Sequence, residues 1–226
     1  MTIWNERDPA ALRELESRLR CDYPTMHAIV ADGAVKVRGT YSVVHEGQDI
    51  ARYSLCMKLP PDYPHSLPAV WETAERIPRT EDRHINMPAG TLCLGVPAAL
   101  WIALGGNFSI DRVLDIPVRN FLIGNSMVEA GEDWPYGEWA HGAKGMLRFF
   151  GETIGTDDPR TIVKFIDGLI NEKVRGHWPC PCGSGAIVRK CHTDAIQQLR
   201  LVPAELLAES GILILDVMKK LARASR

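Results

Sequence analysis

The sequence has little excess of either charge, because 26 Lys and Arg residues stand against 28 Asp and Glu residues among 226, a formal net charge of −2. A protein that binds nucleic acid usually carries a clear basic excess, so we expect no nucleic-acid partner. The sequence also lacks a run of ~18 apolar residues, the length that a membrane span needs. It opens without the basic-then-apolar order of a signal peptide. These absences predict a cytoplasmic protein with no membrane partner.

Cysteine is scarce, and its distribution is uneven. Six cysteines are too few for a disulfide scaffold in a chain of this length. Three of them, Cys180, Cys182 and Cys191, lie close together, and His192 follows directly. Clustered cysteines in a chain with no export signal favour a metal site, although a reducible disulfide and chance clustering stay open as alternatives.

Three sulfurs and one imidazole are a ligand set that suits tetrahedral zinc. Gly183 and Gly185 allow the tight turn that returns the second pair of ligands to the first. Because four protein ligands leave no position for water, the sequence predicts a closed, structural Zn²⁺ site at these four residues. A module this small has little core, so the metal would supply much of its folding free energy.

The N-terminal half has the periodicity of a helix followed by strands. Asp8-Pro9 is typical of a helix start, and apolar residues then repeat at helical spacing up to Leu19. Three apolar stretches with strand character follow: 35–43, 53–59 and 69–71. Short turns between them favour an antiparallel meander. The four prolines within 60–68 predict a stiff, shaped connection.

The C-terminal half is predicted to be helical. Ser109 lies where it could cap a helix that continues past Pro117, which would kink it or sit near its first turn. Three amphipathic helices are expected further along the chain: 146–154, 161–174 and 203–224. Asp158-Pro159 introduces the second of them with a cap and a proline.

A turn-rich stretch from His84 to Trp101 contains a single cysteine, Cys93. Acyl transfer through a cysteine needs a thiolate, a hydrogen-bond donor for the developing oxyanion and a positioned acceptor. Asn86 could supply the donor from seven residues upstream, and His84 could orient the loop or assist proton transfer. A cysteine near a histidine is more often structural, so spacing alone leaves Cys93 open between a nucleophile and a packing residue.

The order of motifs around Cys93 resembles that of the ubiquitin-conjugating enzymes. The matches are to the family's proline turn, its His-Pro-Asn triplet, its Gly-x-Ile-Cys-Leu segment, its tryptophan eight residues after the cysteine and the start of its next helix: Tyr63-Pro64 with Pro68, His84-Ile85-Asn86, Gly90 to Leu94, Trp101 and Ser109-Ile110. The resemblance covers roughly residues 8–140. Ile85 stands where the family has proline, and the stretch from His84 to Cys93 is one residue shorter than usual.

This resemblance implies an α+β fold with an N-terminal helix, a four-strand antiparallel meander and C-terminal helices, over residues 1–140. It implies a thioester on Cys93, an oxyanion donor at Asn86 and a supporting role for His84. The acidic residue that assists the incoming amine in the family is assigned to Asp133, with Glu132 as second choice. A helical extension over 141–176 and a small helical zinc-binding tail over 177–226 are expected to complete the chain.

Residues 178–192 resemble the SEC-C motif, a zinc module appended to many bacterial proteins as a docking element, and keep its Cys-Pro-Cys-Gly-Ser-Gly order. A conjugating-enzyme-like core with this tail is similar to the conjugating-enzyme-like proteins of antiphage CBASS operons, some of which act on the C-terminus of a cGAS-like nucleotidyltransferase. The resemblance implies a protein partner that donates a C-terminal glycine to Cys93 for transfer to an amine. Two alternatives stay open: a catalytically inactive binding module, and a zinc-tail adaptor whose N-terminal domain is a scaffold.

Overall fold

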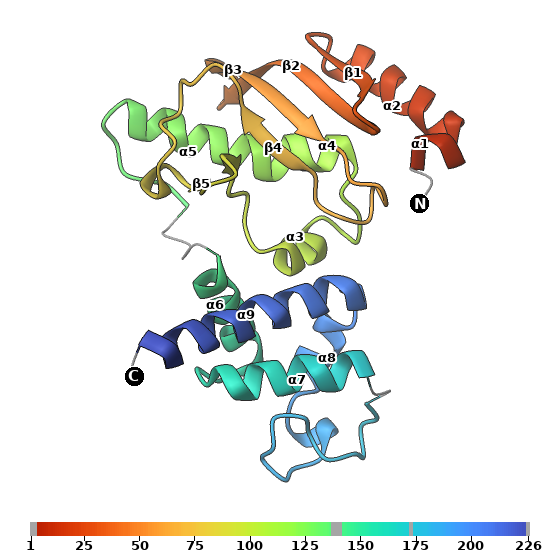
Figure 1. Ribbon diagram of the computed structural model, residues 1–226, viewed down its shortest axis with the longest axis vertical. Helices are drawn as coiled ribbons and strands as arrows, with labels where there is room; N and C mark the ends of the chain where they lie inside the picture. The colour runs from red at the N-terminus through yellow and green to blue at the C-terminus, as the bar shows by residue number, and fades with distance from the viewer. Residues whose placement is uncertain (1–3, 137–141, 172–173, 225–226) are drawn as a thin grey trace. The chain divides into compact units, whose positions relative to one another are not determined.

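A computed structural model describes residues 4–136, 142–171 and 174–224 (Figure 1). The chain forms two compact units, each built from two stretches of sequence. The first unit comprises Met1–Leu94 and Asn107–Glu138, and the second comprises Gly95–Gly106 and Trp139–Arg226. The expected boundary at residue 140 lies outside the described residues, and the one at 176 stays a prediction.

The first unit contains a four-strand antiparallel sheet, as predicted. The strands are β1 (Met26–Ala31), β2 (Ala34–His45), β3 (Gln48–Lys58) and β4 (Ala69–Glu72), and their order in the sheet follows the sequence. Helices accompany the sheet in the same unit, which confirms the predicted α+β class. Sequence periodicity located the last three strands, whereas β1 followed only from the resemblance.

Two short turns set the register of the first three strands. Asp32-Gly33 joins β1 to β2 and Glu46-Gly47 joins β2 to β3, and all four residues have positive φ. Two-residue turns with positive φ match the twist of antiparallel strands. With this register, Tyr53, Leu55 and Met57 are buried on one face of β3, as their alternation predicted.

Helices at both ends of the first unit's sequence accompany the sheet. The N-terminal pair is α1 (Trp4–Arg7) and α2 (Pro9–Asp22), whose first turn is capped by the Asp8 carboxylate at 3.0 Å from the Ala10 amide. Three consecutive helical segments lie across the sheet in Figure 1: α4 (Ile110–Val113), η2 (Leu114–Val118) and α5 (Arg119–Glu129). The Tyr41 hydroxyl donates to the Leu114 carbonyl at 3.1 Å and thereby joins sheet to helix.

The start of α4 is held by the proline-rich connection and not by the predicted cap. Ser109 stands at the N-cap position, but its side chain makes no cap hydrogen bond, so this detail of the prediction was wrong. Instead the Tyr63 hydroxyl accepts from the Ile110 amide at 2.9 Å, and the Pro64 carbonyl accepts from the Phe108 amide at 2.8 Å. The stiff connection over residues 60–68 therefore fixes where the consecutive segments α4, η2 and α5 begin.

The second unit is helical. Its longer segments are α3 (Pro97–Ala103), α6 (Ala143–Ile154), α7 (Pro159–Asn171), α8 (Thr193–Leu199) and α9 (Ala204–Ala224). Helices α7 and α9 lie side by side in Figure 1, and α6 packs on both. Three of these helices were predicted, with the Asp158 carboxylate capping α7 as expected, whereas α3 and α8 were not.

Trp101 belongs to the second unit, although it was matched to a family tryptophan near the cysteine. It lies in α3, is buried, and its indole Nε1 donates to the Leu201 carbonyl at 2.7 Å.

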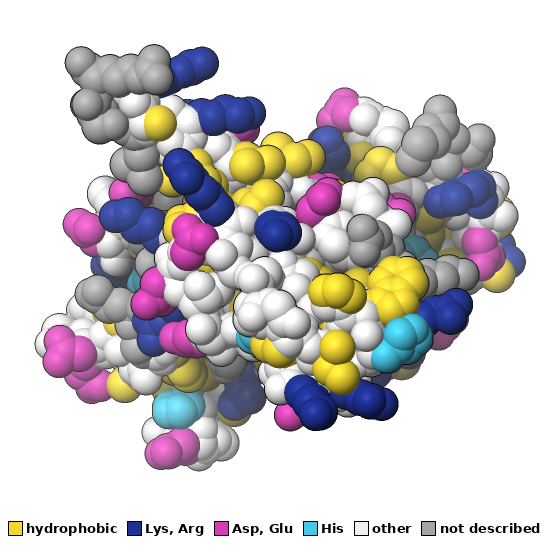
Figure 2. Space-filling view, turned by 90° about the horizontal axis from the view of Figure 1, so that it is seen from below, with side chains coloured by type: hydrophobic (Ala, Val, Ile, Leu, Met, Phe, Trp, Pro, Cys, Tyr) yellow, Lys and Arg dark blue, Asp and Glu magenta, His cyan; other side chains and the backbone are white. Residues whose placement is uncertain are grey.

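Among the described residues, none of the helices has the length and apolarity that would cross a membrane. Basic and acidic side chains are interspersed over the face drawn in Figure 2.

Candidate functional sites

Cys93 directly follows a small hairpin. A helical turn, η1 (Glu81–Arg83), leads into β5 (Ile85–Asn86), which pairs with β6 (Thr91–Leu92). The Cys93 amide donates to the His84 carbonyl at 2.8 Å, and the Cys93 side chain is half-buried. This hydrogen bond closes the hairpin at the point where the cysteine leaves it, so the position of Cys93 is set by the backbone of His84.

His84 is a buried residue with a left-handed backbone conformation, φ 56°. Its ring packs on the indole of Trp134, with 4.2 Å between ring centroids and 32° between planes. A non-glycine residue in this conformation costs free energy and persists only where surrounding contacts determine it. The ring contact with Trp134 and the bond from the Cys93 amide place His84 at the base of the hairpin, and its role at Cys93 stays a prediction.

Asn86 is exposed, and its side-chain amide already has two acceptors. Its Nδ2 donates to the Thr91 hydroxyl at 3.2 Å and to the Leu92 carbonyl at 3.3 Å. Both distances are at the long end of the hydrogen-bond range, so these bonds are weak. Asn86 therefore lies beside the residue that precedes Cys93, and one of its two N–H groups would have to be released before it could serve an oxyanion.

Two residues that sequence reasoning missed anchor the hairpin to α5. The Arg83 guanidinium donates from Nε to the Asn125 side-chain oxygen at 2.9 Å and from Nη2 to the Asn125 carbonyl at 3.1 Å. Asn125 is fully buried, and its Nδ2 donates to the Phe121 carbonyl. A polar amide directly after the apolar run of α5 is the sequence signal that could have identified this anchor, because a buried amide requires partners.

The candidate acidic residues lie in the segment after α5. Asp133 and Glu132 are both exposed, and the Glu132 amide donates to the Met127 carbonyl at 2.9 Å. Asp133 directly precedes Trp134, whose ring contacts His84. The acid is thus covalently next to a residue that touches the Cys93 hairpin.

The predicted metal ligands converge in the second unit. Ligand atoms of Cys180, Cys182, Cys191 and His192 all lie within 4.8 Å of one another. The Cys182 and Cys191 sulfurs are 3.7 Å apart. Two sulfurs bound to one tetrahedral zinc at ~2.3 Å would be separated by roughly 3.8 Å, so the side chains fit that ion with little movement.

The local fold explains this convergence. Gly183 and Gly185 adopt φ of 80° and 79°, the tight turn that was predicted for them. The short helical turn η3 (Val188–Lys190) then carries the chain back to Cys191. The Cys180 amide donates to the Ala186 carbonyl at 2.8 Å, which closes the loop between the two ligand pairs.

The thiols of the cluster do not ionise alike. Burial raises the pKa of Cys180 to about 12. Burial opposes ionisation of Cys182 too, but hydrogen bonds with the Ser184 side chain and backbone outweigh it and lower the pKa of Cys182 to about 6. A metal ion bound at the cluster would favour the thiolate form of its cysteine ligands.

His192 links the cluster to the end of α6. Its Nδ1 lies 3.2 Å from the Cys180 sulfur and 3.1 Å from the Cys191 sulfur, and its Nε2 lies 2.7 Å from the Ile154 carbonyl. Because a carbonyl can only accept, Nε2 carries the proton, and Nδ1 is the atom that could bind a metal ion. The ring also satisfies a carbonyl at the C-terminus of α6 that has no partner within the helix.

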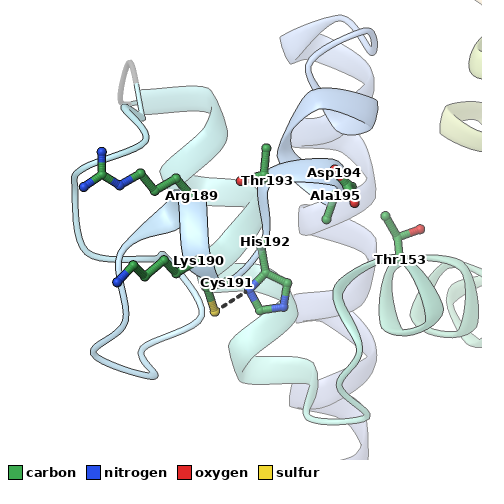
Figure 3. Close-up of a pocket in the computed structure, with 8 residues that line it drawn as sticks. All are labelled: Thr153, Arg189, Lys190, Cys191, His192, Thr193, Asp194 and Ala195. Carbon is green, nitrogen blue, oxygen red and sulfur yellow. Dashed lines mark hydrogen bonds between the residues drawn. The ribbon is translucent and has the colours of Figure 1, made fainter.

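A shallow cavity of about 490 Å³ lies beside the cluster (Figure 3). In Figure 3 the His192 ring is directed to the Cys191 sulfur, while the Arg189 and Lys190 side chains extend outward. Thr153 of α6 lines the opposite side. The cluster thus has a polar, open border on one side.

Comparisons of the chain with protein-family models, with curated proteins and with solved structures found no match.

Proposed function

We propose that Cys93 carries an acyl group as a thioester and transfers it to an amine, in the manner of a ubiquitin-conjugating enzyme. One observation carries the proposal: the hairpin that presents Cys93 is closed by the His84 carbonyl and places the Asn86 amide next to Leu92. A cysteine that served only as packing would not require a hairpin with a left-handed residue at its base.

The reaction requires an activated donor, an acyl adenylate or a thioester of a C-terminal glycine on a partner protein. The Cys93 thiolate attacks the carbonyl carbon, the bond to AMP or to the donor sulfur breaks, and a thioester forms on Cys93. A lysine amine then attacks the same carbon, the Cys93 thiolate leaves, and the amine loses a proton to a base. Asp133 is the assigned base, and Asn86 the donor to the developing oxyanion.

A cGAS-like nucleotidyltransferase of an antiphage operon is the proposed donor, on the strength of the combined resemblance of the core and the tail. In this proposal the second unit is a docking appendage. Its four ligands would hold a structural Zn²⁺, which supplies no chemistry to Cys93.

A binding module without catalysis is the second candidate. The observation that favours it is the engagement of both Asn86 N–H groups by Thr91 and Leu92, an arrangement that braces the hairpin. In that case Cys93 would form no covalent intermediate.

The test is incubation of the purified chain with a tagged nucleotidyltransferase whose C-terminal glycine is supplied as a thioester, so that the donor is already activated. Wild-type protein is expected to give an adduct that thiols cleave, and Cys93→Ser an ester adduct that survives reducing gel electrophoresis. Cys21→Ser is the matched control, because Cys21 is an exposed cysteine of α2 in the same unit. Absence of any thiol-sensitive adduct on Cys93 would overturn the enzyme and favour the binding module.

A further inference from the structure

Trp134 packs directly on the backbone of α5. A Cβ atom added at Gly124 would lie 2.7 Å from the indole atoms Cη2 and Cζ3. Real contacts of a Cβ with carbon atoms are not that short, so only glycine leaves room for the indole at this turn of the helix. Phe121, one turn earlier, meets the same indole edge-on at 6.0 Å. The position of Trp134 is therefore fixed by the surface of α5.

The indole of Trp134 also meets the hairpin of Cys93. Trp134 stacks on the His84 ring at 4.2 Å, and the His84 carbonyl holds the Cys93 amide at 2.8 Å. Arg83, the residue before His84, is bound to Asn125, the residue after Gly124. Two consecutive residues at the base of the hairpin are thus attached to two consecutive residues of α5, one of them through Trp134.

We propose that Trp134 is a positioning residue for Cys93, acting through the ring and carbonyl of His84. The inference rests on the proposed function for its consequence, which is control of acyl transfer at Cys93. A shift of ~1 Å at a reacting group can cost about 10²-fold in rate. Because Asp133 precedes Trp134, the same indole also sets where the segment that bears this acid leaves the helix.

The experiment observes Cys93 without any partner. Protein labelled with ¹⁵N-cysteine gives one amide signal per cysteine, and the signal of Cys93 reports its hydrogen bond to His84. The rate of alkylation by iodoacetamide, resolved for each cysteine by peptide mass spectrometry, reports the thiol. The ratio of the Cys93 rate to the rate of the exposed Cys21 cancels changes that affect the whole protein.

Gly124→Ala is the perturbing variant, because its new methyl group displaces the indole. We expect a shifted Cys93 amide signal with faster hydrogen exchange, and a change of about 5-fold or more in the alkylation ratio. Gly211→Ala in α9 is the matched control, since the same substitution there meets only Ile166, at an ordinary 3.6 Å. It is expected to leave Cys93 unchanged. Combining Gly124→Ala with Trp134→Phe, whose smaller ring makes room for the methyl group, is expected to restore most of the wild-type ratio.

Trp134→Leu is a second variant that keeps apolar cover but removes the ring stacking, and it serves if Gly124→Ala does not fold. A folded variant of either kind with unchanged Cys93 exchange and an unchanged alkylation ratio would overturn the proposal, and Trp134 would then be core packing alone. The result is separate from the proposed function. A positive result with no trapped adduct on Cys93→Ser would overturn the enzyme and retain the positioning role.

Discussion

The two cysteine sites of this protein are built by opposite means. Cys93 in the first unit is one thiol, and its place is set by hydrogen bonds and ring contacts that involve His84, Arg83 and Trp134. The site of the second unit brings three thiols and an imidazole together within one short stretch of the chain, from Cys180 to His192. Side chains can position a single thiol and leave it accessible, whereas several thiols need a cation to be held together as thiolates. The first arrangement is typical of a reactive thiol and the second of a structural metal site.

The largest expected effect is that of metal removal on the stability of the second unit. A structural zinc site can contribute on the order of 10 kcal/mol of apparent binding free energy at neutral pH. We expect one zinc per chain by elemental analysis, and we expect a chelator to lower the melting temperature of the second unit while the Cys93 amide signal stays in place. Cys56→Ser is the control. Because Cys56 lies in β3 outside the cluster, this variant should keep the metal content of the wild-type protein. A reduced, folded sample with no metal would refute the site.

The second-largest effect is expected at Cys93. Asn86→Ala should slow transfer from Cys93 by about 10²-fold, the cost of removing one oxyanion donor, with the first unit still folded. Single-turnover transfer to an amine measures the rate. Thr91→Val is the matched control, because it removes the acceptor of an Asn86 hydrogen bond and keeps the amide. A wild-type rate for Asn86→Ala would mean that Asn86 only braces the hairpin.

A smaller effect is expected where the hairpin is anchored on α5. Asn125→Ala removes the side-chain oxygen that accepts from Arg83 Nε, while the bond to the backbone carbonyl remains, and should lower the free energy of unfolding by about 2 kcal/mol, the scale of a hydrogen bond to a charged group. Urea unfolding measures this change. Asn171→Ala in α7 is the control in the second unit, since Asn171 is exposed and should change stability little. Equal effects of the two substitutions would argue against the anchor.

The smallest effect compares two residues at the start of α4. Ser109→Ala should change stability by less than about 0.5 kcal/mol, because the Ser109 hydroxyl caps nothing. Asn107→Ala should cost about 1 kcal/mol, because the Asn107 side-chain oxygen accepts from the Ser109 amide at 3.0 Å. Thermal melting of the two variants tests the difference, and the reverse order would restore Ser109 as the cap.

Sequence signals between neighbouring residues predicted most of the helices and strands. Alternation around Tyr53 and Leu55 located β3, and Asp158-Pro159 located the start of α7, because these signals depend on residues close in sequence. The ligands of the cluster were found for the same reason, since Cys180 and His192 are only twelve residues apart. Periodicity did not reveal the dependence of α4 on Tyr63 or of the hairpin on Asn125, since each contact joins residues more than forty positions apart.

Residues 95–106 leave the first unit's sequence and belong to the second, where the Trp101 indole is bound by Leu201. A gene segment that began after residue 140 would encode the second unit without α3, and Leu201 would lose the donor from Trp101. The second unit therefore cannot be gained or lost through a single recombination event at that point, as a cassette at the end of a gene would be. Changes in the C-terminal stretch of the second unit must remain compatible with the twelve residues encoded directly after Cys93-Leu94, so the two cysteine sites are tied to one another in inheritance.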